Sequence, residues 1–298
     1  MTGGQIVSAL AQTLTYASPL LFAGLGEMLS ERVGVLNIGL EGQLLVGAFT
    51  AAYVSAISGS PSLGLMAAVV GSAATGGLFA LFGVVMRRDQ VIVGTTINFL
   101  ALGLTGMLYR AWTTGQATAP ITIPLPRLIG SGATSINALT IAALVLIPLA
   151  HLLLFRTRMG VALRATGEAP SAAAAAGISV TRLRVGVSVV NGALCGLGGA
   201  ALAIGINSTF AEGMTGGRGF IALAVVVFGR WMPFGVLGAA LLFAGADVLQ
   251  SRLQASGALS LPYPIILAIP YVLTLAALAI RGARSRAPAA LGRAFEQG

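Results

Sequence analysis

The residues in this sequence that could do chemistry are mostly amides and hydroxyls placed inside long apolar runs. Groups of this kind bind an uncharged polar solute, such as a nucleoside or a sugar, through hydrogen bonds. Each could instead make a hydrogen bond between helices, worth about 1 to 2 kcal/mol at most, and we favour that interpretation for any single residue. Asn98 is the candidate we favour for a translocation path. The full set of path candidates is Asn37, Glu41, Gln43, Thr95, Asn98, Asn191 and Asn207.

The second apolar run is interrupted by an acid and two amides within Val35–Gln43. An acidic side chain at mid-bilayer costs about 2.5 to 3.5 kcal/mol, so Glu41 should face protein or water. Asn37 and Glu41 are four residues apart, which predicts one helical face, and two nearby glycines would allow a break in the helix. A broken helix beside a translocation path is one interpretation. The alternative, slightly favoured for Glu41 itself, is that it caps or braces a helix near the cytoplasmic interface and is paired with Arg32. For the segment as a whole we favour a structural or gating role.

The residue types that are absent exclude several classes of protein. The 298 residues contain no lysine, which excludes a P-loop ATPase and a Schiff-base enzyme. The one histidine, His151, and the one cysteine, Cys195, lie in apolar runs with nothing nearby to complete a metal or nucleophile site. The sequence therefore predicts no catalytic residue, no metal site and no enzyme.

The composition indicates a polytopic membrane protein. Hydrophobic residues make up 56% of the chain and charged residues only 8%, against roughly 25% charged in an average soluble domain. About 20 apolar residues span a bilayer as a helix, and runs of that length predict an all-α bundle of eight or nine segments in one domain, 1–298. The expected spans are Ile6–Gly26, Val33–Ile57, Ser62–Met86, Val91–Trp112, Ile136–Phe155, Val185–Ile206 and Tyr263–Ile280, with an interrupted stretch, Gly219–Leu253.

Arginine placement predicts the orientation, because short basic loops stay on the cytoplasmic side. Arginines follow the third span, flank the loop at about 156–184 and follow the last span in the tail at about 281–298. These three places should be cytoplasmic, which leaves the N-terminus and the Thr113–Ser135 loop outside. This topology closes only if Gly219–Leu253 is a short helix, a break and a second helix that returns to the side it entered from. The net charge of +9 is thus explained by topology and not by nucleic-acid binding.

The loop at 156–184 contains the most informative segment. Pro170 suits the first turn of a helix and Gly177 the residue just after its end, so the two bracket about two turns of alanine. Such a short helix is marginal alone, and its small side chains permit close approach by another protein. Glu168 near its start would complement the helix dipole. A docking helix and an ordinary helix on the membrane surface are equally compatible with this spacing.

Two runs of residues resemble a known family. Gly26–Gly42, together with Gly167-Glu168-Ala169-Pro170, Ala172-Ala173 and Gly177-Ile178, is similar to the permease subunits of ATP-binding-cassette (ABC) importers for branched-chain amino acids, ribose and nucleosides. The first run is most similar to the nucleoside and simple-sugar branch. The resemblance implies that the alanine segment is the coupling helix that docks on a separate ATPase. The implied coupling residues are Gly167, Glu168, Ala169, Pro170, Ala172, Ala173 and Gly177. The family often has a polar residue in place of Ala169.

The resemblance also implies an assembly. It would contain an ABC ATPase that binds ATP and Mg²⁺, a second permease chain forming a heterodimer, and an extracytoplasmic solute-binding lipoprotein. This chain would bind no cofactor of its own and would lie in the inner membrane of a bacterium. Transport would proceed by alternating access, most readily of nucleosides; simple sugars or branched-chain amino acids are the alternatives.

A stand-alone secondary transporter is the alternative from another class. It would need a buried carboxylate or histidine relay, for which we consider only Glu41 and Asp247, both near predicted helix ends.

Overall fold

The computed structural model describes residues 3–114, 122–130, 134–256 and 287–295. Within these ranges, seven helices are long and apolar enough to cross a membrane. The expected polytopic helical bundle is therefore confirmed. The expected span Tyr263–Ile280 and most of the tail at 281–298 lie outside the described residues.

The elements follow one another with short connections. In chain order they are α1 Gly3–Arg32, α2 Leu40–Ser58, α3 Pro61–Phe79 with a π-helical end η1 Ala80–Val85, α4 Gln90–Thr113, β1 Arg127–Ile129, β2 Ile136–Asn137, α5 Ala138–Arg156, α6 Arg158–Glu168, α7 Pro170–Ala175, α8 Val180–Ala200 with a π-helical end η3 Ala201–Asn207, α9 Arg218–Phe228 and α10 Pro233–Ser256. The two short strands pair antiparallel.

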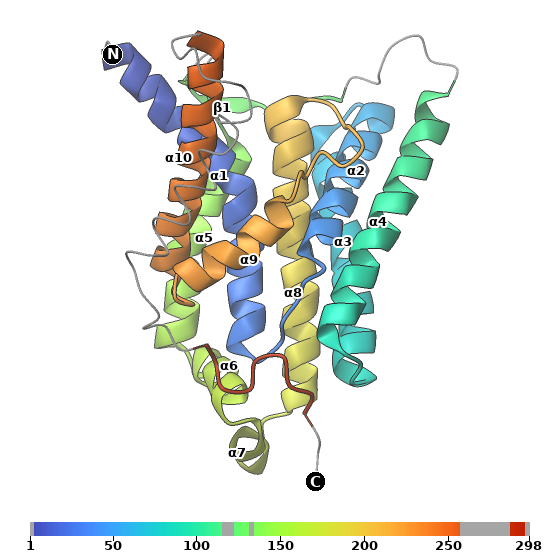
Figure 1. The fold of residues 1–298 in the computed structure, drawn as a ribbon, viewed down its shortest axis with the longest axis vertical. Coiled ribbons are helices and arrows are strands. Elements are labelled where there is room, and N and C mark those ends of the chain that lie inside the picture. Colours follow the sequence, from blue (N-terminus) through green and yellow to red (C-terminus); the bar gives the residue numbers. More distant parts are fainter. Residues whose placement is uncertain (1–2, 115–121, 131–133, 257–286, 296–298) are drawn as a thin grey trace.

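Helix α8 runs through the middle of the bundle, with α1 on one side and α2 and α3 on the other (Figure 1). Three glycines of α8, Gly192, Gly196 and Gly199, allow this close packing. A Cβ atom added at Gly196 would lie 2.3 Å from the carbonyl oxygen of Ala68 on α3, and one at Gly199 would lie 2.2 Å from that of Leu44 on α2. The helix backbones are thus in direct contact.

The second expected span, Val33–Ile57, is wrong at its start. Residues 33–39 are not helical, and α2 begins only at Leu40. Gly34 has a φ of +84°, a conformation that ends α1 and that other residues rarely adopt. Figure 1 shows this extended segment rising from the end of α1 to α2, which starts inside the bundle.

The interrupted stretch Gly219–Leu253 has the expected arrangement of a short helix, a break and a second helix. Helix α9 has 11 residues, which at 1.5 Å per residue is about 16 Å and only half of a bilayer core. It descends from inside the bundle, and α10 then rises to the end where α1 starts (Figure 1). Arg252 on α10 confirms this return, because its guanidinium donates to Ser8 and Gln12 of α1.

The loop at 156–184 and the described part of the tail lie at one end of the bundle, opposite the N-terminus (Figure 1). The turn between α3 and α4, which carries Arg87 and Arg88, lies at the same end. The two arginine-rich loops and the described part of the tail, which carries Arg293, therefore share one face, as the orientation argument requires. The sequence did not predict α6, which fills the first half of the loop.

The helix contacts predict opposite effects for two glycines of α8. Gly196→Ala should destabilise the protein by about 1 to 3 kcal/mol, because the added methyl overlaps the backbone of α3. Gly186→Ala should stabilise it by about 0.5 to 1 kcal/mol, because nothing lies within 4 Å and alanine favours the helix. Thermal unfolding of the purified variants in one detergent compares them. A midpoint for Gly196→Ala equal to that of the parent would contradict the packing.

Candidate functional site

The extended segment Val33–Gly39 is held by side chains from distant helices. Glu27 on α1, fully buried, accepts from the backbone N–H of Asn37 at 2.8 Å and from the Asn191 amide on α8 at 2.8 Å. The Asn37 side chain accepts from the backbone N–H of Gly39 and donates to Gln43 at 3.1 Å. Glu27 therefore ties three parts of the bundle together at the break.

Helix α4 supplies the second set of contacts to the break. The Gln90 side chain accepts from the N–H of Leu36 at 2.8 Å. The Asn98 amide donates to the carbonyl of Ile38 at 2.9 Å, while its oxygen accepts from the N–H of Gly42 at 2.8 Å. Asn98 thus caps the first turn of α2 from a neighbouring helix, in place of a capping residue in the chain before it.

Glu41 caps a different helix from its own. Its two carboxylate oxygens accept from the N–H groups of Gly217, at 2.8 Å, and of Gly219, at 2.7 Å, at the start of α9. A carboxylate at a helix N-terminus is favoured by the helix dipole. Helices α2 and α9 therefore both begin inside the bundle, and Glu41 joins their N-termini.

A cavity of about 270 Å³ lies where these two helix starts meet α4. It is lined by Glu41, Gly42, Leu45, Thr95, Asn98, Phe99, Leu102, Gly213, Thr215, Gly216 and Phe220. Its polar groups are one carboxylate, one amide, hydroxyls and backbone, set among apolar side chains. This is the composition of a site for a small polar solute, and the volume is just below the usual range for such sites.

The cavity contains three of the seven path candidates, Glu41, Thr95 and Asn98. The others lie elsewhere. Asn37, Gln43 and Asn191 are fully buried in or beside the Glu27 network. Asn207 ends η3, where its amide donates to the carbonyl of Leu202.

Two expectations about Glu41 are wrong. Asn37 and Glu41 do not share a helical face, because Asn37 precedes the helix. Glu41 is not paired with Arg32, whose guanidinium donates to the carbonyl of Trp231 at 2.7 and 3.0 Å.

The segment expected to be a coupling helix is α7, Pro170–Ala175. Pro170 lies in its first turn, and Gly177 follows with a φ of +84°. The N–H of Ile178 then donates to the carbonyl of Ala173, which closes the end of the helix. The local geometry is thus the one that Pro170 and Gly177 predict.

The expected coupling residues differ in exposure, and Pro170 is half-buried. Glu168, Ala169 and Ala172 are exposed, whereas Ala173 and Gly167 are buried. A Cβ atom at Gly167 would lie 2.2 Å from the carbonyl oxygen of Arg32, so this position joins α6 to the end of α1.

The tail segment 287–295 crosses the same junction. The N–H of Ala290 donates to the carbonyl of Gly167 at 2.9 Å, and that of Gly292 donates to the carbonyl of Gly34 at 3.1 Å. Arg184, a buried residue of α8, donates to the carbonyls of Val33, at 2.9 Å, and of Arg293, at 2.8 Å. The tail, the break and α6 therefore form one bonded unit.

Sequence reasoning missed the acids of α1. It considered Glu41 and Asp247 alone, yet Glu27 and Glu31 are both buried. Glu31 accepts from the indole N–H of Trp231, in the turn between α9 and α10. The available signal was two acids four residues apart at the end of an apolar run, since acids in such a place require partners.

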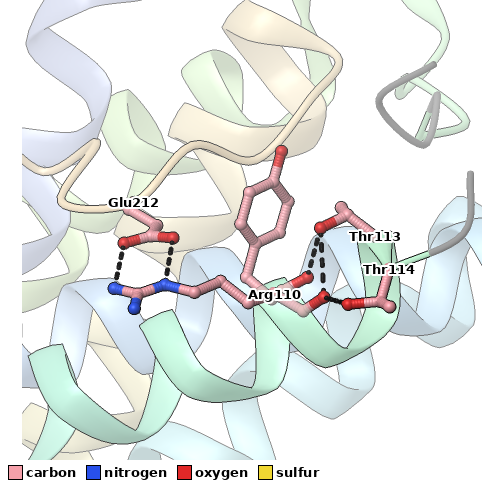
Figure 2. Close-up of polar contacts among 5 residues, drawn as sticks. Arg110, Thr113, Thr114 and Glu212 are labelled. Carbon is pink, nitrogen blue, oxygen red and sulfur yellow. Dashed lines mark hydrogen bonds and ion pairs between the residues drawn. The ribbon is translucent and has the colours of Figure 1, made fainter. Parts of the chain in front are cut away.

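An ion pair joins the end of α4 to the loop that lines the cavity. Arg110 at the end of α4 makes two parallel bonds of 2.9 Å to Glu212, in the loop between η3 and α9, as Figure 2 shows. Glu212 precedes Gly213, which lines the cavity. The hydrogen bond from Arg110 holds the pKa of Glu212 below its ordinary value. The pair therefore joins the same two elements that enclose the cavity.

Comparison with known proteins places the chain in a family. Residues 9–278 match the family described as branched-chain amino acid transport system, permease component. The chain belongs to this permease family. No solved structure matches it.

Several curated relatives of the permease carry a substrate in their names. This chain is 36% identical to a guanosine ABC transporter permease, NupQ of Bacillus subtilis, over 99% of this chain and 98% of the relative. It is 31% identical to a nucleoside ABC transporter permease, NupC of Lactococcus lactis, over 95% of this chain and 94% of the relative. It is also 36% identical to a putative glucose ABC transporter permease, TsgC13 of Haloferax volcanii, over 81% of this chain and 76% of the relative.

The Arg110–Glu212 pair should control access to the cavity of the permease. Thr215→Cys places a thiol on the buried cavity wall, and the native Cys195 is fully buried, so maleimide labelling reports on that wall. Adding Glu212→Gln should speed this labelling several-fold, and the exchanged pair Arg110→Glu with Glu212→Arg should slow it again. Equal rates in all three proteins would show that the pair does not hold the loop.

Salt provides the internal control for this prediction. Both side chains of the pair are exposed, by 74% and 41%, so salt should screen it and speed labelling in the protein with the intact pair. Salt should have no such effect after Glu212→Gln. The folded-state pKa of Glu212 is lowered, so the pair is fully present above the ordinary glutamate pKa of about 4.3 and is lost only as the pH falls further.

Proposed function

We propose that this permease is the membrane-spanning subunit of an ATP-driven importer whose substrate is a nucleoside. The observation that carries the proposal is the full-length similarity to permeases named for guanosine and for nucleosides. The cavity beside Glu41 and Asn98 supports it, because amides, hydroxyls and a carboxylate can bond the hydroxyls and base edges of an uncharged solute.

A simple sugar is the second candidate substrate. It is supported by the relative named as a putative glucose permease, and a sugar presents the same hydroxyl chemistry to the cavity. Branched-chain amino acids, which give the family its name, carry two charges that the cavity would have to pair. The described cavity lining has one carboxylate and no basic side chain.

The energy for transport would come from a partner. ATP and Mg²⁺ would be bound by a separate ABC ATPase, and this chain would contribute no catalytic residue. The complete importer would also contain a second permease chain, forming a heterodimer, and an extracytoplasmic lipoprotein that delivers the solute. The face with α6, α7 and the tail would be cytoplasmic, because it carries the arginine-rich loops, and the N-terminus would lie outside.

Helix α7 would receive the ATPase motion. From there a continuous set of contacts leads into the bundle: α7 follows α6, Gly167 packs on the carbonyl of Arg32, and Arg32 donates to the carbonyl of Trp231. Trp231 begins the turn into α10, and α9 before it starts at the cavity. A displacement of α7 would thus be passed to the helix that Glu41 caps.

A stand-alone ion-coupled transporter is less well supported. Three of the acids in the described spans already accept hydrogen bonds: Glu27, Glu31 and Glu41. Asp247 interacts electrostatically with Arg218, whereas the nearby Arg252 donates to α1.

Reconstitution tests the proposal as a whole. Vesicles with both permease chains, the ATPase and the binding protein should accumulate labelled guanosine only when ATP is supplied. Glucose and leucine, tested in the same vesicles, decide between the candidate substrates. Uphill uptake by this chain alone under an ion gradient would overturn the proposal.

Docking on the ATPase can be blocked at one exposed position. Ala172→Trp places a large ring on the outer face of α7 and should abolish both co-purification of the ATPase and ATP-dependent uptake. Ala172→Ser is the matched control and should leave both unchanged, because the side chain stays small. Normal co-purification with the tryptophan variant would show that α7 is not the docking element.

The cavity can be blocked by a substitution that lies away from the docking helix. Leu102 lines the cavity, and Leu102→Trp should reduce uptake to background while the ATPase still co-purifies. Leu104, on the same helix, is 48% exposed and does not line the cavity, so Leu104→Trp should transport normally. Unchanged uptake with Leu102→Trp would remove this cavity from the path.

A further inference from the structure

A second, larger cavity lies on the outer surface of the bundle, away from the path. It measures about 440 Å³ and runs between α3 with η1 and α4. Its lining is Leu78, Phe82, Arg88, Asp89, Ile92, Val93, Thr96, Ile97 and Leu100. We call it the α3–α4 groove. Figure 1 shows α4 at the edge of the bundle.

The length of the groove matches one leaflet of a bilayer. On α4 the lining runs from Asp89, at the turn, to Leu100. The 11 residue steps between them rise about 16 Å, and half of a hydrocarbon core of about 30 Å is about 15 Å. The groove therefore extends from the membrane surface to the bilayer centre, as one acyl chain does.

The surface end of the groove carries a net positive charge, from two arginines and one aspartate. Arg87 and Arg88 are exposed, and neither guanidinium has a hydrogen-bond or ion-pair partner among the described residues. The acid beside them, Asp89, is occupied in capping α4, where one carboxylate oxygen accepts from the N–H groups of Val91 and Ile92. Basic pockets between membrane helices bind anionic lipid headgroups.

The turn that holds the two arginines is fixed by the backbone. The N–H of Arg88 donates to the carbonyl of Phe82 at 3.0 Å, and that of Met86 donates to Leu81 at 2.8 Å, at the end of the π-helical turn η1. Arg87 has a φ of +55°. The backbone that carries both arginines is therefore fixed, with Arg88 in the lining of the groove and Arg87 next to it.

The side chains of the groove disfavour a helix as its occupant. Helices that pack in membranes meet through small residues, as α8 does with α2 and α3. The groove is instead lined by leucine, isoleucine and phenylalanine, and Phe82, Ile92 and Leu100 are exposed by 39%, 67% and 54%. Large, exposed apolar side chains such as these can pack along a flexible acyl chain.

We propose that the α3–α4 groove binds an anionic phospholipid, with one acyl chain along Phe82, Ile92 and Leu100 and its phosphate at Arg87 and Arg88. This inference is independent of the transported solute. The bound lipid would support α4 on the side away from the cavity, and α4 carries the Asn98 amide that holds the break in place.

Native mass spectrometry of the detergent-purified permease complex tests the inference. Phosphatidylglycerol and phosphatidylcholine with identical acyl chains are added in turn. The parent should retain phosphatidylglycerol in several-fold excess, and Arg87→Gln with Arg88→Gln should abolish that preference. Arg182→Gln is the control, because Arg182 is an exposed arginine at the same end of the bundle and away from the groove.

A second pair of variants tests the acyl-chain part and the competing occupant. Ile92→Trp should narrow the groove and reduce retention of both lipids, whereas Leu104→Trp on the same helix should not. Equal retention of the two lipids by the parent, or a preference that survives loss of both arginines, would overturn the inference. Efficient cross-linking of Ile92→Cys to the second permease chain would also overturn it, because a protein would then occupy the groove.

Discussion

The structure depends on one constraint: peptide groups that leave a helix inside a bilayer must find hydrogen-bond partners within the protein. Residues 33–39 separate α1 from α2, and side chains from three helices, α1, α4 and α8, hold this break. Glu27 binds the N–H of Asn37, Gln90 that of Leu36, Asn98 the carbonyl of Ile38, and Arg184 the carbonyl of Val33. These four positions require polar side chains because the backbone N–H and C=O groups at the break need hydrogen-bond partners.

The same constraint makes the candidate site polar. Helices α2 and α9 begin inside the bundle, and the first N–H groups of any helix lack partners within it. Asn98 and Glu41 supply those partners, and both line the cavity. The groups offered to a solute are thus also caps, so a change at either residue alters the start of a helix, α2 for Asn98 and α9 for Glu41, as well as the cavity. This is why neighbouring apolar positions such as Leu102 separate transport from folding better than the polar residues do.

Local patterns in the sequence were enough to predict most of the fold. Hydropathy gave the spans, and Pro170 with Gly177 gave α7, because these features act over a few residues. The same reasoning wrongly extended α2 back to Val33. An apolar segment with a few polar residues looks helical, because the sequence does not reveal that its N–H groups donate to side chains of other helices. The site joins Glu41 to Gly217, 176 residues away, and Arg184 to Val33, 151 residues away. Such pairs follow from packing of the whole bundle and from no local pattern.

The position of the break relative to the docking face explains how a short surface helix could govern a cavity in the bundle. Gly167 presses on the carbonyl of Arg32, and the tail binds the carbonyls of Gly167 and Gly34, so α6 and the start of the break cannot move separately. Helices α1 and α2 are antiparallel, so one unbroken helix cannot connect them. A compact turn would connect them, but α2 would then begin at the membrane surface and not inside the bundle. The extended residues place that start beside α9. Motion at the docking face is then delivered to two helix N-termini at once, and these are the elements that enclose the cavity.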